Sequence, residues 1–406
     1  MSINHSAKLV TDGLVMYYDM SNTKKSWKGA PTTNVLVDTG DLSTGNWGYT
    51  LFGNWPATGA VANVATAPDG TLTATRLSAS GYSRFQRYTV SANQVYTFSM
   101  WVRNVNMPGA ISLQLATGLN GTLVSYGYAT GVNLTANWAV YSYTITIPAS
   151  GVNQLEVGLN VNANSYNSNI FCDVWHPQLE AQSFATPFVN GTRSNAQVLV
   201  DLTGNNTITP TNLNSTSYLD NTCITLDGNN QYLYTSGNSY WNAWSPDGTN
   251  GNASMTIELI FNSSDTGGLL ISRPWNGNGQ YNYTMSNAGF GLHSNASGAN
   301  LAYSSICTGA TVHMVWWMNS TQYGVYKNGV EYVAATNHGL SGNGGSGGTN
   351  AFGTLFGSLY PYGEGWGGNT GFSIAGKYYL AKIYNRALSA AEVAQNFQAL
   401  RGRYSL

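Results

Sequence analysis

Charged residues are scarce in this chain. Only 8% of its 406 residues are Asp, Glu, Lys or Arg, whereas an average soluble protein has about 25%. Sixteen basic residues against seventeen acidic ones leave a net charge of −1, so the excess of positive charge typical of nucleic-acid binding is missing. Aromatic residues make up 13% of the chain, which excludes intrinsic disorder, because disordered chains have few aromatics and many charges.

Cysteines and long apolar runs are also scarce. The three cysteines, Cys172, Cys223 and Cys307, lie far apart and are odd in number, which argues against a disulfide framework or a zinc motif and favours small buried residues. No apolar stretch reaches the ~18 residues of a membrane span. The first ten residues lack the basic region and apolar run of a signal peptide. We therefore expect no membrane insertion and no signal-directed secretion.

What the chain does contain is a recurring alternation of apolar and polar residues in short runs. Clear examples are residues 94–102, 139–147, 255–261 and 311–318. Period two with Val, Ile, Thr, Tyr and Trp predicts half-buried antiparallel strands. Asn-Gly, Asp-Gly and Gly-Gly pairs between the runs predict tight turns, and Asn328-Gly329 predicts a hairpin between residues 323–327 and 330–333. The pattern indicates an all-β chain of sandwiches or jelly rolls.

One helix is predicted near the C-terminus. Ser389 and Glu392 form a capping box, in which the serine hydroxyl caps the third amide and the glutamate reaches back. Apolar residues then recur at helical spacing at Val393, Phe397 and Leu400. Gly402 is the predicted stop. With a single apolar stripe, this helix is expected to pack across a sandwich as a closing element.

Three segments of the second half resemble the laminin-G-like, concanavalin A-like jelly roll. Residues 378–393 resemble its last strand and helix, and residues 312–333 resemble its central hairpin, including His313. Residues 224–233 resemble its early strand pair, with Leu226 where the family usually has Phe. The three matches occur in family order, so the resemblance implies this fold. It implies little about function, because the fold serves many.

A further resemblance to the same family is divided between two segments that lie far apart in the sequence. Residues 12–19 resemble the first strand of the same domain in phage structural proteins, and residues 198–206 resemble the segment that normally follows it shortly after. The residues between them resemble a second phage-associated module, a carbohydrate-binding-module-like jelly roll, in segments 34–47, 67–77 and 177–193.

We interpret this as one antiparallel sandwich nested in another. Residues 1–32 and 194–406 form a discontinuous laminin-G-like domain, and residues 33–193 form the inserted carbohydrate-binding-module-like domain. Insertion is physically easy where chain ends lie close together. The alternative is two domains in series with a free N-terminal arm. Nesting is favoured because a strand at residues 14–18 needs a sheet with which to pair.

No catalytic motif stands out, and we predict a non-enzyme. Glycoside hydrolysis requires two carboxylates facing one bond, but the glutamates are isolated in sequence: Glu156, Glu180, Glu258, Glu331, Glu364 and Glu392. The histidines form no i, i+4 ligand pair, and His313 is predicted to be an ordinary sandwich residue. Distant acids can still meet in space, so a polysaccharide depolymerase remains the least favoured alternative.

Calcium is the candidate cofactor, because laminin-G-like and carbohydrate-binding folds often hold one ion. The candidate oxygens belong to Asp19, Asp69, Asp173 and Asp227. Asp-Gly pairs indicate turns more often than calcium ligands. We therefore assign no residue to a metal.

A sugar site is predicted in two aromatic clusters of loop residues. Sugar rings stack on Trp and Tyr, while Asn and Gln amides bond hydroxyl groups. The first cluster contains Trp241, Trp244 and Trp275, and the second contains Tyr360, Tyr362 and Trp366. Alternatively, these rings pack against the sandwich or form a subunit contact.

Together the two modules resemble those of bacteriophage virion structural proteins. The resemblance implies a capsid decoration, tail fibre or appendage component, assembled in the host cytoplasm and displayed on the virion surface. Its expected partners are other virion proteins and host cell-surface glycans, and we expect a homo-oligomer, with the trimer a common form in such appendages. Many copies would multiply a weak single-site affinity for glycans during host attachment. The alternative is a purely structural cement protein without sugar binding.

Overall fold

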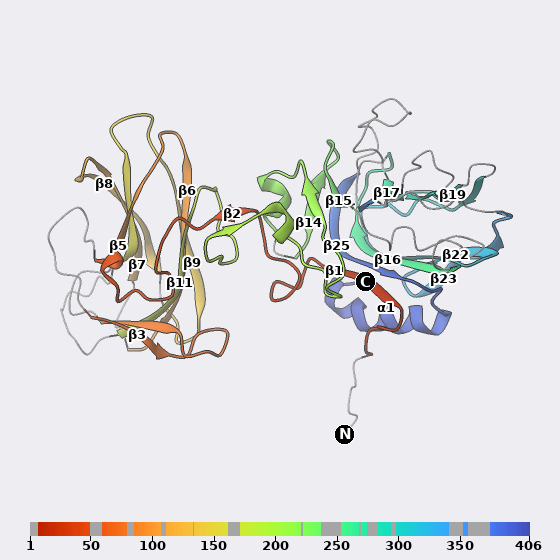
Figure 1. The fold of residues 1–406 in the computed structure, drawn as a ribbon, viewed down its shortest axis with the longest axis horizontal. Coiled ribbons are helices and arrows are strands. Elements are labelled where there is room, and N and C mark those ends of the chain that lie inside the picture. The colour runs from red at the N-terminus through yellow and green to blue at the C-terminus, as the bar shows by residue number, and fades with distance from the viewer. Residues whose placement is uncertain are drawn as a thin grey trace, which may run out of the picture. The chain divides into compact units, whose positions relative to one another are not determined.

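The chain forms two compact β-units, with one α-helix among the residues that the structure describes (Figure 1). Unit 1 is Met1–Ala30 with Asn195–Leu406, and unit 2 is Pro31–Ser194. The predicted all-β class, with antiparallel sandwiches and a C-terminal helix, is confirmed. The computed structural model describes residues 7–48, 59–78, 85–106, 111–132, 134–160, 171–220, 222–236, 253–267, 269–273, 282–293, 298–340, 352–355 and 374–406.

Unit 2 is a sandwich of two antiparallel sheets. One sheet has the order β3-β4-β11-β6-β9 and the other has the order β5-β10-β7-β8. A short pair, β2 with β12, lies where the chain enters and leaves the unit. The strands are β2 (Thr32–Thr33), β3 (Ala60–Ala65), β4 (Ala74–Ser78), β5 (Phe85–Thr89), β6 (Val95–Asn104), β7 (Ile111–Leu119), β8 (Thr122–Val132), β9 (Ala139–Thr146), β10 (Gln154–Asn160), β11 (Phe171–Glu180) and β12 (Thr192–Arg193), with a 3-10 turn at Gly45–Trp47.

Alternation along the strands of unit 2 separates its core from its outer faces. In β6, Phe98 and Met100 are buried in the cluster that fills the sandwich, together with Leu155 and Val157 of β10. Successive side chains of a strand point to opposite faces, so Trp101, which follows Met100, lies on the outer face. Even-numbered residues of β6, such as Phe98 and Met100, therefore point into the core, and odd-numbered residues, such as Trp101, point to the outer face of the first sheet.

Unit 1 also contains two antiparallel sheets. The first has the order β1-β25-β16-β21-β22-β23, with β14 also paired to β25, and the second has the order β13-β15-β24-β17-β18-β19-β20. The elements are β1 (Leu14–Asp19), β13 (Thr209–Thr211), β14 (Ile224–Asp227), β15 (Tyr232–Ser236), β16 (Met255–Asn262), β17 (Leu269–Arg273), β18 (Asn282–Ser286), β19 (Gly289–His293), β20 (Gly298–Ala302), β21 (Thr311–Met318), β22 (Gln322–Lys327), β23 (Val330–Asn337), β24 (Phe352–Leu355), β25 (Ala375–Tyr384) and α1 (Ala390–Tyr404), with 3-10 turns at Asn195–Gln197 and Ser215–Tyr218.

The earliest strand of the chain belongs to the sheet of the C-terminal segment. Strand β1 pairs antiparallel with β25, from Leu14 opposite Tyr384 to Asp19 opposite Leu380. Figure 1 shows the red strand beside the blue one. Unit 1 is thus completed by residues that precede unit 2 in the sequence, and the N-terminal segment is not a free arm.

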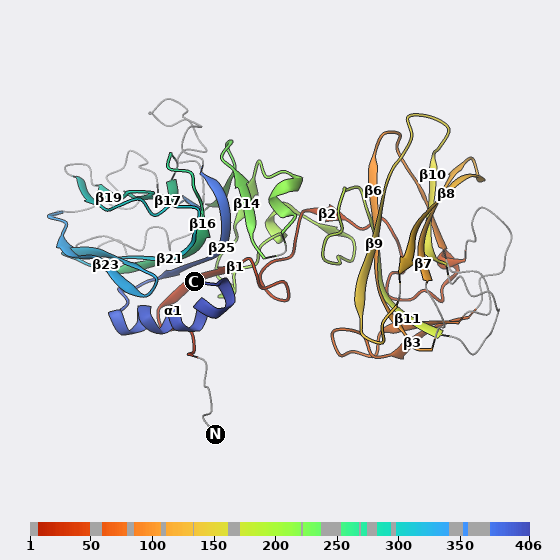
Figure 2. The same cartoon turned by 180° about the vertical axis from the view of Figure 1, so that it is seen from behind.

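Helix α1 covers one face of the first sheet of unit 1, and the second sheet lies on the other side (Figures 1 and 2). Seven of the eight residues of β16 are consequently buried, from Met255 to Phe261. The predicted capping box between Ser389 and Glu392 is present. The predicted stop at Gly402 is wrong, because the helix continues to Tyr404, whose ring packs in the cluster that contains Leu380.

The predicted hairpin at Asn328-Gly329 is confirmed. Lys327 pairs with Val330, and the two turn residues have φ values of 51° and 77°, the positive values that a two-residue hairpin requires. A Cβ on Gly329 would also lie 2.7 Å from the ring of Phe397. Glycine is therefore required both by the turn and by the close approach of α1.

The three cysteines are free and buried, as predicted. Among the residues described, no helix has both the length and the apolar character to cross a membrane.

Excision of unit 2 is expected to leave unit 1 folded. Lys28 N donates to Val198 O at 2.8 Å, and Trp27 forms a β-bridge with Leu199. The two chain segments therefore run side by side next to the junction. Replacing residues 31–194 by Gly-Ser-Gly is expected to preserve one cooperative thermal transition with a Tm within a few degrees of that of unit 1 in the full chain, measured by circular dichroism. A chain without a cooperative transition would contradict this prediction, and the separate 31–194 fragment serves as the companion sample.

Candidate functional site

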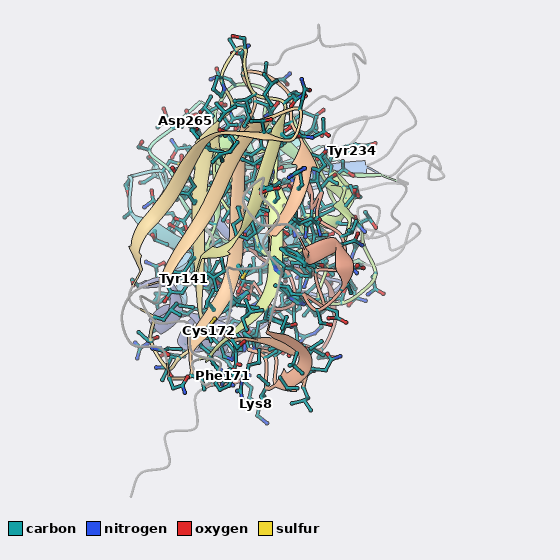
Figure 3. The ribbon with its side chains drawn as sticks, turned by 90° about the vertical axis from the view of Figure 1, so that its left-hand side faces the viewer. Lys8, Tyr141, Phe171, Cys172, Tyr234 and Asp265 are labelled. Atoms are coloured by element: carbon teal, nitrogen blue, oxygen red, sulfur yellow. The ribbon has the colours of Figure 1, made fainter. Side chains whose placement is uncertain are left out.

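The aromatic residues predicted to bind sugar lie outside the described residues. They are Trp241, Trp244, Trp275, Tyr360, Tyr362 and Trp366, and their role stays a prediction. The site described below is a different one and lies in unit 2. Its strands are shown with their side chains in Figure 3, where Phe171 and Cys172 mark the start of β11.

The candidate calcium ligands that are described already have partners. Asp19 accepts two hydrogen bonds from Arg403, at 2.7 and 2.9 Å. Asp69 accepts from the amide and hydroxyl of Thr71. Asp227 accepts hydrogen bonds from the side-chain amides of Asn214 and Gln231. No three His, Cys, Asp or Glu residues group as metal ligands in the described part of the chain.

The fourth candidate, Asp173, is the centre of a charged row across the outer face of the first sheet of unit 2. Asp173 on β11 is opposite Arg76 on β4 and Arg103 on β6. Arg76 Nε donates to Asp173 Oδ1 at 2.8 Å, and Arg103 Nε donates to Oδ2 at 3.0 Å. The guanidinium groups lie over the rings of Phe171 and Trp138, at 5.7 and 5.0 Å from the ring centroids. We call these five residues the charged row.

A row of aromatic rings lies next to the charged row. Trp101 is opposite Trp175 on one side and Val140 on the other, and the two indoles meet edge to face at 6.5 Å. Both indoles are half-buried, and Val140 is 49% exposed. Trp175 Nε1 donates to Thr73 Oγ1 at 3.1 Å, which fixes the indole against the loop that precedes β4. We call Trp101 and Trp175 the aromatic row.

A bulge in β11 extends this row by one ring. The register shifts between Trp175 and Gln178, and His176 has a φ of 50°; bulges of this kind re-aim a side chain. The imidazole is stacked between Trp175 and Phe188, with centroid distances of 3.3 and 3.7 Å. Burial lowers the pKa of His176 to about 4, against the opposing charge of Asp69. The ring is therefore neutral at neutral pH.

Past the bulge, the same face is closed by the segment that leaves unit 2. Glu180 Oε1 accepts from the Thr186 amide at 2.7 Å, and Oε2 accepts from the Thr32 hydroxyl at 2.9 Å. Burial lowers the pKa of Arg193 to about 10, opposed by Glu180. All four side chains are buried. Past the bulge, the side chains of β11 on this face are thus covered, whereas the two tryptophans of the aromatic row and the two arginines of the charged row are partly exposed.

A second polar cluster lies beneath α1 in unit 1. Glu258 Oε1 lies 3.0 Å from His313 Nε2 and 3.1 Å from Lys382 Nζ, and Oε2 accepts from Tyr384 and Asn396. All five side chains are fully buried. His313 is thus a buried sandwich residue, as predicted, although its Nδ1 has no hydrogen-bond partner in the described part of the chain. A cluster with no accessible atom cannot contact a substrate, so its role is structural.

The aromatic row was missed at the sequence level, although one of its signals was present. Trp101 and Arg103 alternate with the core residues Met100 and Val102, which places them on the outer face. Their neighbours Asp173 and Trp175 lie on β11, some 70 residues later. Only the register between strands shows that these side chains are adjacent.

The fold and this face define a protein of two β-sandwich units with a charged and aromatic sheet face in the inserted unit. No family model matches the sequence. No curated protein matches it either.

Solved structures similar to part of the chain include receptor-binding parts of botulinum neurotoxins. One is of botulinum neurotoxin type C, which depends on interaction with two ganglioside molecules to enter cells (13% identity, TM-score 0.35, 50% of this chain and 49% of that chain). Others are the binding domain of botulinum neurotoxin DC in complex with rat synaptotagmin II (11%, 0.34, 50% and 49%) and in complex with SialylT (12%, 0.34, 50% and 49%). This chain thus matches about half the length of these structures. At these TM-scores the similarity assigns no family.

Proposed function

We propose that this chain is a glycan-binding structural protein of a bacteriophage virion surface, and that it binds glycans on the outer sheet face of unit 2. The observation that carries glycan binding is the aromatic row, in which Trp101 and Trp175 are half-buried on a strand face and held by neighbours. Such rings offer a rigid apolar surface on which a sugar ring can stack, and the polar groups beside them can bond its hydroxyls.

The virion role rests on the resemblance of the two modules to phage structural proteins and on the nested order of the chain. Other virion proteins are the proposed partners, and a homo-oligomer, of which the trimer is a common form in phage appendages, would present several copies of the face. Linked copies convert a weak single contact into strong attachment. Display on the virion surface is part of the same proposal.

We propose binding without catalysis. Glycoside hydrolysis needs two carboxylates that face the scissile bond. Among the described residues, the candidate face has two buried carboxylates, both 0% exposed: Asp173, which is bonded to two arginines, and Glu180, which is bonded to Thr32 and Thr186. Glu258 in unit 1 is sealed beneath α1. These carboxylates have no access to a glycosidic bond.

Replacing Trp101 by alanine is expected to weaken glycan binding about 10- to 30-fold, because a stacked indole at the centre of a binding face contributes about 1.5–2 kcal/mol. Trp101→Phe keeps an aromatic ring and is expected to lose less. The measurement is a glycan array with the full-length protein, followed by titration calorimetry on the best ligand.

The matched control for this experiment is Tyr332→Ala, which removes a half-buried aromatic residue from β23 in unit 1. Wild-type protein that binds no glycan would overturn the proposal and favour the purely structural cement role. Release of reducing sugar from a bound polysaccharide would favour the depolymerase alternative instead.

A further inference from the structure

We propose that the charged row makes the glycan-binding face selective for acidic polysaccharides, with a sugar carboxylate bound by Arg103 and Arg76. The proposal rests on the function proposed above, since it names the class of glycan that the same face takes. Three features of the charged row support this selectivity: its net charge, its arginine N–H groups that donate to no described residue, and its position beside the aromatic row.

The charged row carries a net positive charge at the surface. Two guanidinium groups share the single carboxylate of Asp173, which leaves one positive charge uncompensated within the row. The side chain of Asp173 is 0% exposed, while those of Arg76 and Arg103 are 33% and 27% exposed. A ligand approaching this face therefore meets the arginines and not the acid.

Both arginines have N–H groups that donate to no described residue. Each bonds Asp173 through Nε and Nη2: Arg76 at 2.8 and 3.2 Å, and Arg103 at 3.0 and 2.9 Å. Across the described residues no hydrogen bond to either Nη1 group is found, and each Nη1 has two N–H donors. Guanidinium groups fixed in this way suit a second carboxylate, because little side-chain freedom is lost on binding.

Aromatic rings hold the two arginines in place. Arg103 lies over the Trp138 ring, and Arg76 lies over the Phe171 ring. The Trp138 indole itself donates to Thr66 O at 3.0 Å, so this ring is also tied to the body of the unit. The planar guanidinium of arginine can lie flat on an aromatic face, which the compact ammonium of lysine cannot do.

The charged and aromatic rows are adjacent. Trp101 is two residues from Arg103 on β6, and Trp175 is two residues from Asp173 on β11. Two residues along a strand span about 7 Å. A sugar stacked on the aromatic row and a carboxylate on the same or the next sugar can therefore contact both rows at once. The nearby acid Asp69 directs its carboxylate to Thr71.

The test compares acidic polysaccharides with their own neutral derivatives. Alginate, polygalacturonate and hyaluronan are each offered to the full-length protein before and after chemical reduction of their carboxyl groups, which removes the charge and keeps the sugar chain. We expect at least one acidic polymer to bind about tenfold more tightly than its reduced form. We also expect this difference to shrink as NaCl is raised, because exposed charges are screened.

The variants separate the role of the arginines from a general charge effect. Arg103→Gln is expected to abolish the preference for the acidic form, and Arg103→Lys to retain part of it. The matched control is Arg87→Gln, which removes an arginine 25% exposed beside the buried Glu156 on the other sheet of unit 2. This control changes the net charge equally and is expected to keep the preference. A cooperative melting transition well above the assay temperature establishes that each variant folds.

The results that would overturn the inference differ in what they say of the proposed function. Equal binding of acidic and reduced polymers that is still lost in Trp101→Ala would remove the acidic selectivity and leave glycan binding intact. Absence of binding to these polymers and to every glycan on the array would overturn both. A preference that survives in Arg103→Gln, or one that is lost equally in Arg87→Gln, would also contradict the assignment to Arg103.

Discussion

Replacing Glu258 by glutamine is expected to lower the free energy of unfolding of unit 1 by about 3–5 kcal/mol, the usual effect of removing one partner from a buried ion pair. The Lys382 ammonium, which lies 3.1 Å from Oε1, would lose its counter-charge in a fully buried site. The glutamine amide would also direct N–H donors at groups that now donate to Oε2, the Tyr384 hydroxyl and the Asn396 amide.

Chemical denaturation monitored separately for the two units measures this effect. The matched control is Glu331→Gln, which removes the same charge from an exposed position on β23 and is expected to change stability by less than about 0.5 kcal/mol. Adding Lys382→Met to Glu258→Gln is expected to recover stability, because a buried apolar residue does not need a counter-charge. Equal effects of the two glutamine substitutions would show that the cluster does not stabilise unit 1.

The same carboxylate gives unit 1 a pH dependence of known sign. Burial alone opposes ionisation of Glu258, but Lys382 and His313 outweigh it and lower its pKa from 4.5 to about 2. A folded-state pKa below the unfolded one means that the stabilisation is fully present above about pH 4.5 and is lost as the pH falls toward 2. Wild-type unit 1 is therefore expected to lose stability over this range, and Glu258→Gln to lose less.

Local sequence signals predicted much of the fold of unit 1. The capping box at Ser389 and the hairpin at Asn328-Gly329 depend on residues within four positions of each other, and both are present. The helix stop at Gly402 failed for a tertiary reason, since packing of Tyr404 extends the last turn. A glycine is weakly unfavourable in a helix, and a buried aromatic ring outweighs that preference.

The candidate site was less predictable, because it is made by pairing between strands. Asp173 is a candidate calcium oxygen by residue type, but its two arginines lie 70 and 97 residues earlier in the sequence, and nothing in the sequence gives the register of their strands. The buried cluster around Glu258 has the same character, since its members come from β16, β21, β25 and α1. Residue type indicates chemistry, whereas adjacency on a sheet depends on register.

Replacing Asp201 by alanine is expected to destabilise unit 1 by about 3 kcal/mol or more, although the residue lies in a loop. Its Oδ1 accepts from the amide of Tyr17 at 2.8 Å, on the strand that precedes unit 2. The other bonds come from the loop itself, from the Thr203 amide and hydroxyl and the amides of Asn205 and Asn206. The Asp201 side chain is buried, at 4% exposed, and its donors are partly buried, so several of them would be left without an acceptor, at about 1–3 kcal/mol each where water cannot replace it.

The control for Asp201 is Asp220, a half-exposed acid of unit 1 that accepts from the Thr222 amide and hydroxyl in a turn of its own. Asp220→Ala is expected to lose no more than about 1 kcal/mol, because its bonds to Thr222 are local and its contact with Lys377, at 3.5 Å, is a partly exposed ion pair. Asp201, by contrast, bonds the loop after unit 2 to Tyr17, which lies on β1 before unit 2. Its hydrogen bonds therefore help to hold β1 in the sheet. The transition of unit 2 is expected to be unchanged in both variants. Equal losses at the two positions would mean that the Asp201 carboxylate contributes nothing beyond an ordinary turn to joining the two parts of unit 1, and that β1 is held by its pairing with β25 and by the other bonds from this loop, such as that of Leu202 N to Tyr17 O.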